Sequence, residues 1–300
     1  MKVLVTGGAG FIGSNLVALL VQKGVTVRVL DSLVSGKRER IPTGVQFIKG
    51  DIRDLEDIKS ALDGITHVVH LAALVSVSES MKDPGSTYDV NVIGAENVLQ
   101  ATRGTGVKRF VYATSAAVYG DDPSLPKKES SPLSPQSPYA LSKVMNELQA
   151  DMYERIFGLS TVGLRFFNVY GKGQSGNHPY ASVIPRWIER IKNKLPITIY
   201  GDGSQTRDFV HINDVVGAIY SALLSDATGV YNIASGEETP LNDLRKIIEG
   251  AYPKPIEVKN EPAREGDILR SVADISRARD ALGFVTTIEL TKGITELLVL

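Results

Sequence analysis

The residues best suited to chemistry are a tyrosine and a lysine near the middle of the chain. Tyr139 and Lys143 follow Ser137 and Pro138, which are a favourable N-cap and a favourable first helical residue. This pattern predicts that Tyr139 lies in the first turn of a helix, with Lys143 beside it on the same face. A helix N-terminus and an ammonium both favour the phenolate. We therefore expect these two effects, together with a cationic cofactor, to lower the pKa of Tyr139 and give a general base that works at neutral pH.

A glycine-rich segment at the start of the chain indicates what this base would work with. Residues 2–6 are typical of a buried strand, and residues 7–13 contain the pattern G-x-G-x-x-G before an apolar-periodic helix. Backbone N–H groups in such a turn can approach a pyrophosphate at the helix N-terminus. Asp31 closes the next predicted strand, 25–30, where a carboxylate can accept both ribose hydroxyls and would repel a 2′-phosphate. The sequence predicts an NAD site, with NAD favoured over NADP.

The order of the elements favours an α/β fold with a doubly wound, mostly parallel sheet. Further strands are predicted at 45–48, 67–71, 109–113 and 161–165, and helices at 55–62, 88–102 and 138–157. Ligands of such sheets bind at the carboxyl ends of the strands. The candidate site residues at those ends are Gly7, Asp31, Asp51, Ala72, Ser115 and Asn168. This clustering predicts one shared cleft.

The pattern becomes irregular after Asn168. A helix is predicted at 183–192, short strands at 197–200 and 230–233, and helices at 276–282 and 289–298. We expect a Rossmann domain that binds NAD, formed by residues 1–168 and 208–235, and a smaller α/β substrate domain, formed by residues 169–207 and 236–300.

Composition narrows the function further. The 300 residues carry a formal net charge of −1, which gives no electrostatic reason to expect nucleic acid or an anionic membrane as partner. The chain has no Cys, which excludes disulfides, thiol nucleophiles and cysteine-ligated metals. The four His residues have no companions at metal-ligand spacing, so we expect no metal. No apolar run approaches 18 residues and no signal segment is evident, so we expect a cytoplasmic protein.

Taken together, the motifs resemble the extended short-chain dehydrogenase/reductase family, and within it the nucleotide-sugar branch that contains the UDP-hexose 4-epimerases. The resemblance covers nearly the whole chain. It rests on residues 6–13, 51–53, 70–73, 114–120, the Tyr139/Lys143 pair, 165–171, 200–203, 207–209 and 264–267. It implies NAD as cofactor, a UDP-sugar as substrate and a homodimer that packs through the helices at 88–102 and 138–157.

The resemblance also implies a role for individual residues. The catalytic residues would be Ser115, Tyr139 and Lys143. The cofactor would contact Gly7, Gly10, Phe11, Ile12, Asp31, Ser32, Asp51, Ile52, Leu71, Ala72, Ala73, Asn91, Tyr139 and Lys143. The substrate would contact Ser115, Asn168, Val183, Tyr200, Arg207, Arg264, Asp267 and Ser271. The implied reaction is inversion at C4 of a UDP-hexose through a 4-keto intermediate.

Two features bear on the choice of substrate. Similarity to the 4,6-dehydratases would call for an Asp-Glu pair where this chain has Ser115 and Ala116. Ser271 is small where some relatives carry a bulky Tyr that closes the pocket against an N-acetyl group. We therefore expect activity on UDP-glucose/UDP-galactose and on UDP-GlcNAc/UDP-GalNAc. The alternatives are another nucleotide-sugar epimerase, such as one acting on UDP-glucuronate, or a dinucleotide sensor without turnover.

Overall fold

The computed structural model describes residues 1–177, 181–263 and 268–299. Its centre is a seven-stranded sheet in the order β11-β6-β5-β4-β1-β2-β3, in which every neighbouring pair is parallel. The strands are β1 (Lys2–Thr6), β2 (Thr26–Asp31), β3 (Gln46–Lys49), β4 (His67–His70), β5 (Arg109–Ser115), β6 (Ser160–Phe166) and β11 (Gly229–Ile233). The strand order changes direction between β1 and β4, where doubly wound sheets bind ligands. The predicted fold class is confirmed.

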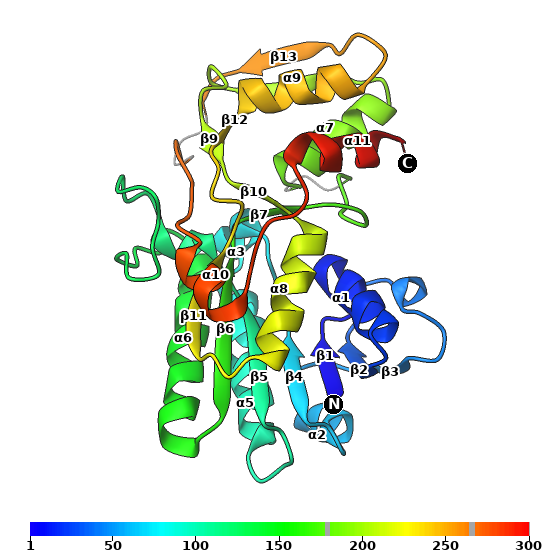
Figure 1. Cartoon of the computed structure of the whole chain (residues 1–300), viewed down its shortest axis with the longest axis vertical. Coiled ribbons are helices and arrows are strands. Elements are labelled where there is room, and N and C mark those ends of the chain that lie inside the picture. The colour runs from blue at the N-terminus through cyan, green and yellow to red at the C-terminus, as the bar shows by residue number, and fades with distance from the viewer. Residues whose placement is uncertain (178–180, 264–267, 300) are drawn as a thin grey trace.

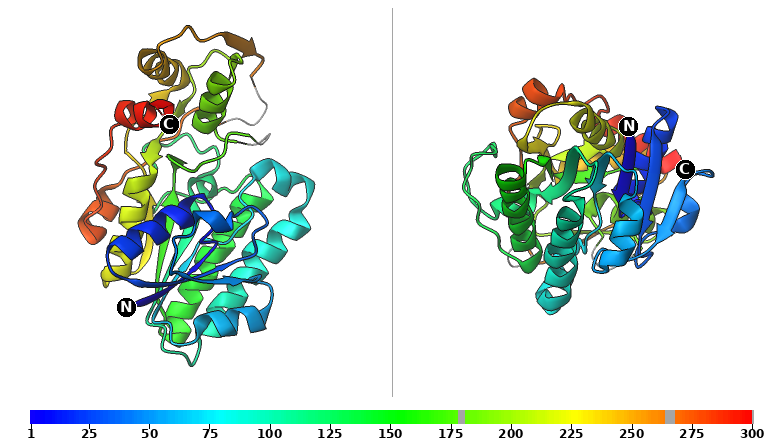
Figure 2. Two further views of the ribbon diagram at one scale, coloured as in Figure 1. Left: turned by 90° about the vertical axis from the view of Figure 1, so that its right-hand side faces the viewer. Right: turned by 90° about the horizontal axis from the view of Figure 1, so that it is seen from below.

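Helices cover both faces of this sheet (Figures 1 and 2). One face carries α1 (Phe11–Gln22), α8 (Ile212–Leu224) and α10 (Ser276–Leu282). The other carries α2 (Leu55–Leu62), α5 (Gly94–Thr102) and α6 (Pro138–Phe157). Successive side chains of a strand point to opposite faces, so Val3 and Val5 pack with α1 while Leu4 joins the cluster on the opposite face. Burial on both faces explains the continuous apolar runs in the sequence.

The region before α5 differs from the single helix expected over 88–102. It contains α3 (Val77–Lys82), α4 (Pro84–Tyr88) and a π-helical segment, η2 (Asp89–Ile93), which runs directly into α5. A π-helical turn displaces the side chains that follow it, so the apolar period of an ideal helix does not describe this stretch. Two short 3₁₀ segments, η1 (Arg38–Arg40) and η3 (Ala116–Tyr119), lie in other connections.

A smaller group of elements lies beyond the carboxyl ends of the sheet (Figure 1). It contains α7 (Val183–Lys192), α9 (Leu241–Ala251), α11 (Leu290–Val299) and the parallel pair β8 (Ile197–Tyr200) and β13 (Val258–Glu261). These elements share a cluster of buried side chains around Trp187. Two short pairs lie between the groups: β7 (Asn168–Tyr170) with β10 (Phe209–His211), and β9 (Thr206–Arg207) with β12 (Thr239–Pro240).

Besides α3 and α4, the helices α8 and α9 were absent from the expected elements. The segment that forms α8 packs against the sheet, α1 and α10, and most of its side chains are buried. A helix buried on several sides lacks the polar stripe that makes a 3.6-residue period visible in sequence. Within the described residues, no helix combines the length and the apolar character needed to cross a bilayer.

Candidate active site

The helix that carries the expected base begins where the sequence predicts. The Ser137 hydroxyl accepts a hydrogen bond from the backbone N–H of Ala140 at 3.1 Å, and Pro138 occupies the first turn of α6. Tyr139 therefore lies in that turn, and its backbone N–H donates to the Ser80 hydroxyl of α3 at 3.1 Å. The second contact holds the start of α6 against α3.

The three expected catalytic residues come together at the end of β5. The hydroxyl groups of Ser115 and Tyr139 are hydrogen-bonded to each other. The Lys143 ammonium, one turn along α6, donates to the Ala113 carbonyl oxygen at 3.1 Å and lies 5.9 Å from the centroid of the Tyr139 ring. A strand end and a helix start thus bring a phenol, a hydroxyl and an ammonium into one place.

Burial dominates the electrostatics of this group. Burial raises the pKa of Tyr139, and the hydrogen bond with Ser115 only partly opposes that effect. Burial also lowers the pKa of Lys143 to about 8, against the opposing influence of the Glu147 carboxylate. In the protein without its cofactor, desolvation therefore dominates the Tyr139 pKa. The lowered pKa expected with a cationic cofactor beside the phenol stays a prediction. A further cation beside the phenol is needed to make it a base at neutral pH.

The glycine-rich turn forms a close-packed backbone cradle. Gly7 has φ +68°, and a Cβ there would lie 2.6 Å from the backbone N of Ala72. A Cβ on Gly13 would lie 2.2 Å from the Gly7 carbonyl oxygen. At Gly10, by contrast, a Cβ would have only the Gly7 carbonyl oxygen nearby. The space beside Gly10 is therefore open at the N-terminus of α1. Phe11 and Ile12 begin α1 and are half-buried beside this opening.

Asp31 joins this cradle to the end of β2. Its carboxylate, 8% exposed, accepts from the backbone N–H of Ala9 at 2.9 Å and from that of Leu33 at 2.8 Å. Ser32 follows it and is half-buried. Each carboxylate oxygen keeps a lone pair for a ribose hydroxyl. An anion-accepting helix N-terminus, a turn with no room for side chains and a carboxylate at the next strand end together fit NAD.

The remaining cofactor candidates surround the same edge of the sheet. Asp51 follows β3, and its hydrogen bond from Arg53 holds the pKa of the Asp51 carboxyl below its usual value. Ile52 is buried, in the same cluster as the apolar side chains of α2 and α5. Leu71, Ala72 and Ala73 follow β4 and are half-buried.

Asn91 does not lie open to a ligand. Its side chain is 1% exposed and exchanges two hydrogen bonds with the backbone of Leu74, at 2.8 and 2.9 Å. It also donates to the Ser142 hydroxyl of α6 at 3.1 Å. The Asn91 amide thus holds the segment after β4 against α6. A contact between Asn91 and the cofactor stays a prediction.

The substrate candidates gather around the short strand pairs. Asn168 begins β7, and both its backbone N–H and its side-chain amide donate to the Asp208 carbonyl oxygen. Arg207 donates to the Ile268 carbonyl oxygen at 2.7 Å, and the Ser271 N–H donates to the Thr206 hydroxyl at 3.4 Å. Val183 begins α7 and Tyr200 ends β8. Arg264 and Asp267 lie outside the described residues.

Sequence reasoning missed the role of Asp208, which joins two distant segments to its own. Its carboxylate is fully buried and accepts from the Ser235 N–H at 2.6 Å, the Ser235 hydroxyl at 2.7 Å, the Gly236 N–H at 3.0 Å and the Ala273 N–H at 3.1 Å. Burial raises the pKa of this carboxyl in spite of these donors. Nothing in the sequence around Asp208 names its partners, because they lie 27 to 65 residues away.

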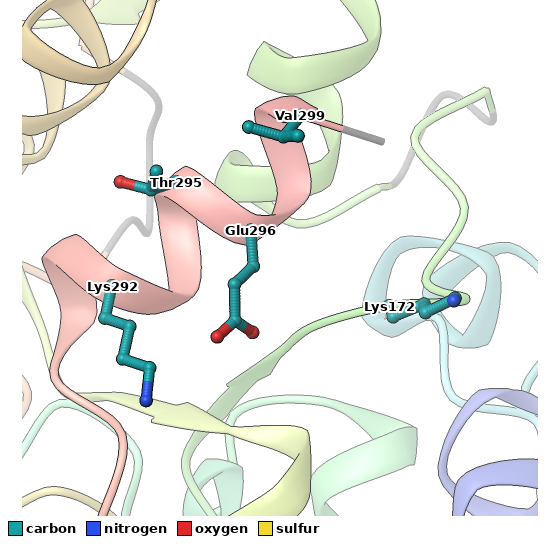
Figure 3. A pocket seen from close by; sticks show the side chains of 5 residues that line it. All are labelled: Lys172, Lys292, Thr295, Glu296 and Val299. Atoms are coloured by element: carbon teal, nitrogen blue, oxygen red, sulfur yellow. The ribbon is translucent and has the colours of Figure 1, made fainter.

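An open cavity of about 590 Å³ lies away from these residues, beside α11. It is lined by Lys172, Lys292, Thr295, Glu296 and Val299. Figure 3 shows Lys292 and Glu296 extending from α11 toward the strands below it, with Lys172 on a separate loop. None of the expected site residues lines this cavity.

Among residues 1–177, 181–263 and 268–299, no three potential metal-ligating side chains gather into a cation site.

Comparison with known proteins gives consistent matches. The model of the NAD dependent epimerase/dehydratase family matches residues 3–234. A UDP-glucose 4-epimerase of Mycolicibacterium smegmatis is 38% identical over 99% of this chain and 97% of its own length.

Two solved structures share the fold over nearly their whole length. One is the UDP-N-acetylglucosamine 4-epimerase of Methanobrevibacter ruminantium in complex with UDP-N-acetylmuramic acid, with TM-score 0.96, 37% identity, and coverage of 99% of this chain and 97% of that one. The other is the UDP-glucose 4-epimerase of Thermus thermophilus in complex with NAD, with TM-score 0.93, 39% identity, and coverage of 100% and 98%.

Proposed function

Because the chain belongs to the NAD dependent epimerase/dehydratase family and is an NAD-dependent nucleotide-sugar epimerase, we propose that it inverts C4 of a UDP-hexose. The observation that carries this proposal is the hydrogen-bonded pair Ser115 and Tyr139 with Lys143 beside it, at the edge of the sheet that also bears the glycine cradle. A base and a dinucleotide site at one edge support oxidation and reduction at a single carbon.

Bound NAD supplies the acceptor, and then the donor, of the hydride that leaves C4 and returns to it. The residues proposed to hold it are the backbone of residues 7–12, with Asp31 at the adenosine ribose. Lys143 is proposed to hold the second ribose and to keep positive charge near the phenol. The crowding at Gly7 and Gly13 supports this assignment, because side chains there would fill the space that a pyrophosphate needs.

The proton moves through the hydroxyl pair. In our proposal the Tyr139 phenolate takes the proton of the 4-hydroxyl group and later returns it, while Ser115 hydrogen-bonds the 4-oxygen. The resulting 4-keto sugar must present its other face before reduction. Binding energy must therefore rest mainly on the nucleotide, which leaves the sugar free to turn. Asn168, Arg207, Arg264 and Asp267 are the groups proposed to hold the UDP part, with Val183 and Tyr200 near the uracil.

We propose that both hexoses and N-acetylhexosamines are accepted. Ser271 is half-buried beside Thr206, and a small side chain there supports room for an N-acetyl group. Replacing Ser271 by Tyr should reduce turnover of UDP-GalNAc at least tenfold relative to UDP-galactose, a difference of about 1.4 kcal/mol. Ser271→Ala is the control and should leave both activities in place. Equal slowing of both substrates by Ser271→Tyr would remove this part of the proposal.

A homodimer and two domains are also proposed. The outer face of α6 exposes Leu141, Met145, Leu148 and Ile156, and Ile93 of η2 is exposed beside it. An apolar stripe of this kind on an enzyme surface supports burial against a second copy. Leu148→Glu should convert a dimer, measured by analytical ultracentrifugation, to a monomer. The separate buried clusters around the sheet and around Trp187 support two domains, proposed as residues 1–168 and 208–235 and residues 169–207 and 236–300. Within the second range, α10 packs on the sheet of the first domain.

The deciding experiment is turnover without added cofactor. The purified protein is incubated with UDP-glucose, UDP-galactose, UDP-GlcNAc, UDP-GalNAc or UDP-glucuronate, and the products are separated by chromatography. We expect each of the first four to equilibrate with its C4 epimer, because the hydride stays on the enzyme. Conversion of UDP-glucuronate alone, or of none of the sugars with NAD bound, would contradict the proposal.

A further inference from the structure

Three residues of α6 contact consecutive residues of β5. Tyr139, Lys143 and Glu147 are spaced four residues apart and therefore lie on one face of the helix. Tyr139 contacts Ser115, and Lys143 contacts the carbonyl oxygen of Ala113. Glu147 contacts the residue between those two, Thr114, whose hydroxyl donates to the Glu147 carboxylate at 2.7 Å. Only the first two of these contacts involve residues with a proposed role in the reaction.

The Glu147 carboxylate also binds the neighbouring strand. Arg165 of β6 donates to it twice, from Nε at 2.9 Å and from a terminal guanidinium nitrogen at 2.7 Å. Thr114 and Arg165 are partners in the parallel pairing of β5 and β6. The carboxylate therefore contacts both strands at one level of the sheet, immediately before Ser115. All three side chains are buried, and Glu147 is 8% exposed.

We propose that Glu147, through Thr114 and Arg165, is a positioning residue that sets the level of α6 against β5 and thereby aligns Tyr139 with Ser115. The expected change in rate rests on the proposed function. The contacts of Glu147 with Thr114 and Arg165 do not depend on it. A shift of α6 along the strand would break their hydrogen bond, and a displacement of about 1 Å can cost about a hundredfold in rate.

A structural role alone is the competing explanation, and the chain contains a matched control. Thr161 of β6 donates its hydroxyl to the Glu154 carboxylate of α6 at 2.9 Å, near the opposite end of the helix. This contact joins the same helix to the same sheet through the same pair of residue types, and Thr161 is as buried as Thr114. Thr114→Val and Thr161→Val each remove one hydroxyl with little change in volume, so both variants should fold.

The experiment compares these two variants, purified with NAD, in three measurements. Thermal unfolding should show similar losses of stability for both. Thr114→Val should lower kcat by about tenfold or more with little change in KM, whereas Thr161→Val should keep the wild-type value. The third measurement is NMR titration of ¹³C-labelled tyrosine, with the Tyr139 signal assigned from Tyr139→Phe. The pKa of Tyr139 should be higher in Thr114→Val than in wild type and unchanged in Thr161→Val.

The titration decides the proposal independently of activity. An equal Tyr139 pKa in wild type and Thr114→Val overturns it, whatever the rates. Equal kcat values for the two valine variants of an active enzyme also overturn it. If the wild-type protein turns over no UDP-sugar, the proposed function fails, and the titration alone still supports or rejects the alignment by Glu147.

Discussion

The glycine cradle and the region around Asp208 are built in different ways. The cradle is local: Gly7, Gly10 and Gly13 lie in one turn, and Asp31 reaches it from the adjacent strand. The Asp208 carboxylate instead gathers Ser235, Gly236 and Ala273 from separate parts of the chain. The first arrangement depends on the absence of side chains, and the second depends on one buried acceptor. Substitutions in the two regions should therefore affect different properties.

The largest effect is expected at the proposed base, outside both regions. Tyr139→Phe removes the hydroxyl that carries the proton, and kcat should fall by about 10²–10⁴-fold, the usual contribution of a general base. NAD content and affinity for the UDP-sugar should stay near the wild-type values, measured by absorbance of the denatured supernatant and by calorimetry.

The matched control for that substitution is Tyr153→Phe. Tyr153 lies on the same helix, and its hydroxyl donates to Glu96 at 2.7 Å, far from the carboxyl ends of the strands. This variant should lose about 1 kcal/mol of stability and keep its kcat. A Tyr139→Phe variant that retains full turnover would show that the proton moves by another route.

A methyl group in the cradle should affect cofactor retention before anything else. In Gly13→Ala the new Cβ would meet the backbone of Gly7 and Gly8, which cannot move aside without opening the turn. We expect loss of bound NAD on gel filtration and a stability loss of about 1–3 kcal/mol. Gly250→Ala, in α9, meets no atom within 4 Å and should be neutral or slightly stabilising. Full NAD occupancy in Gly13→Ala would mean that the cradle can widen. Cofactor binding would then not depend on the absence of side chains there.

Substitution of the buried acceptor should affect several substrate contacts together. Asp208→Asn replaces one carboxylate oxygen by an NH₂ group that faces donors, which costs about 1–3 kcal/mol. Because Asp208 holds the segments beside Asn168, Arg207 and Ser271, we expect a rise in KM for the UDP-sugar of about tenfold with unchanged NAD content. Asp54→Asn provides the control, since this N-cap of α2 makes only local contacts and Asn caps as well as Asp. Loss of NAD without a change in KM would show that Asp208 supports the cofactor site and not the substrate contacts.

The difference between local contacts and contacts across distant segments explains which features the sequence could predict. The strands of the sheet and the start of α6 were predictable because apolar runs, helix caps and glycine turns act over a few residues. The roles of Glu147, Thr114 and Asp208 were not, because their partners are fixed only by the pairing of strands. The 139, 143, 147 spacing was a usable signal for Glu147. The opposing effect of burial on the Tyr139 pKa was not foreseen, because the depth of a side chain, unlike the nearby charges, is not evident from the local sequence.

The smallest expected effect comes from removing the negative charge of Glu147 while keeping its contact with Thr114. Burial holds the pKa of Lys143 at about 8, and the Glu147 carboxylate raises it against that effect. The other groups that face this ammonium are Tyr139 and His70, and burial keeps His70 neutral with a pKa of about 3. Glu147→Gln keeps the acceptor for Thr114 but removes the negative charge, and it leaves the cation of Arg165 unpaired.

Both changes favour the neutral amine, so Lys143 in this variant should lose its proton at a lower pH. The cationic form, which favours the phenolate, is present below the pKa and is lost as the pH rises through it. The alkaline limb of kcat/KM should therefore move to lower pH in Glu147→Gln. Glu154→Gln, at the other end of α6, should leave the limb in place. An unchanged limb in Glu147→Gln, with turnover retained, would show that Glu147 acts on the reaction through geometry alone.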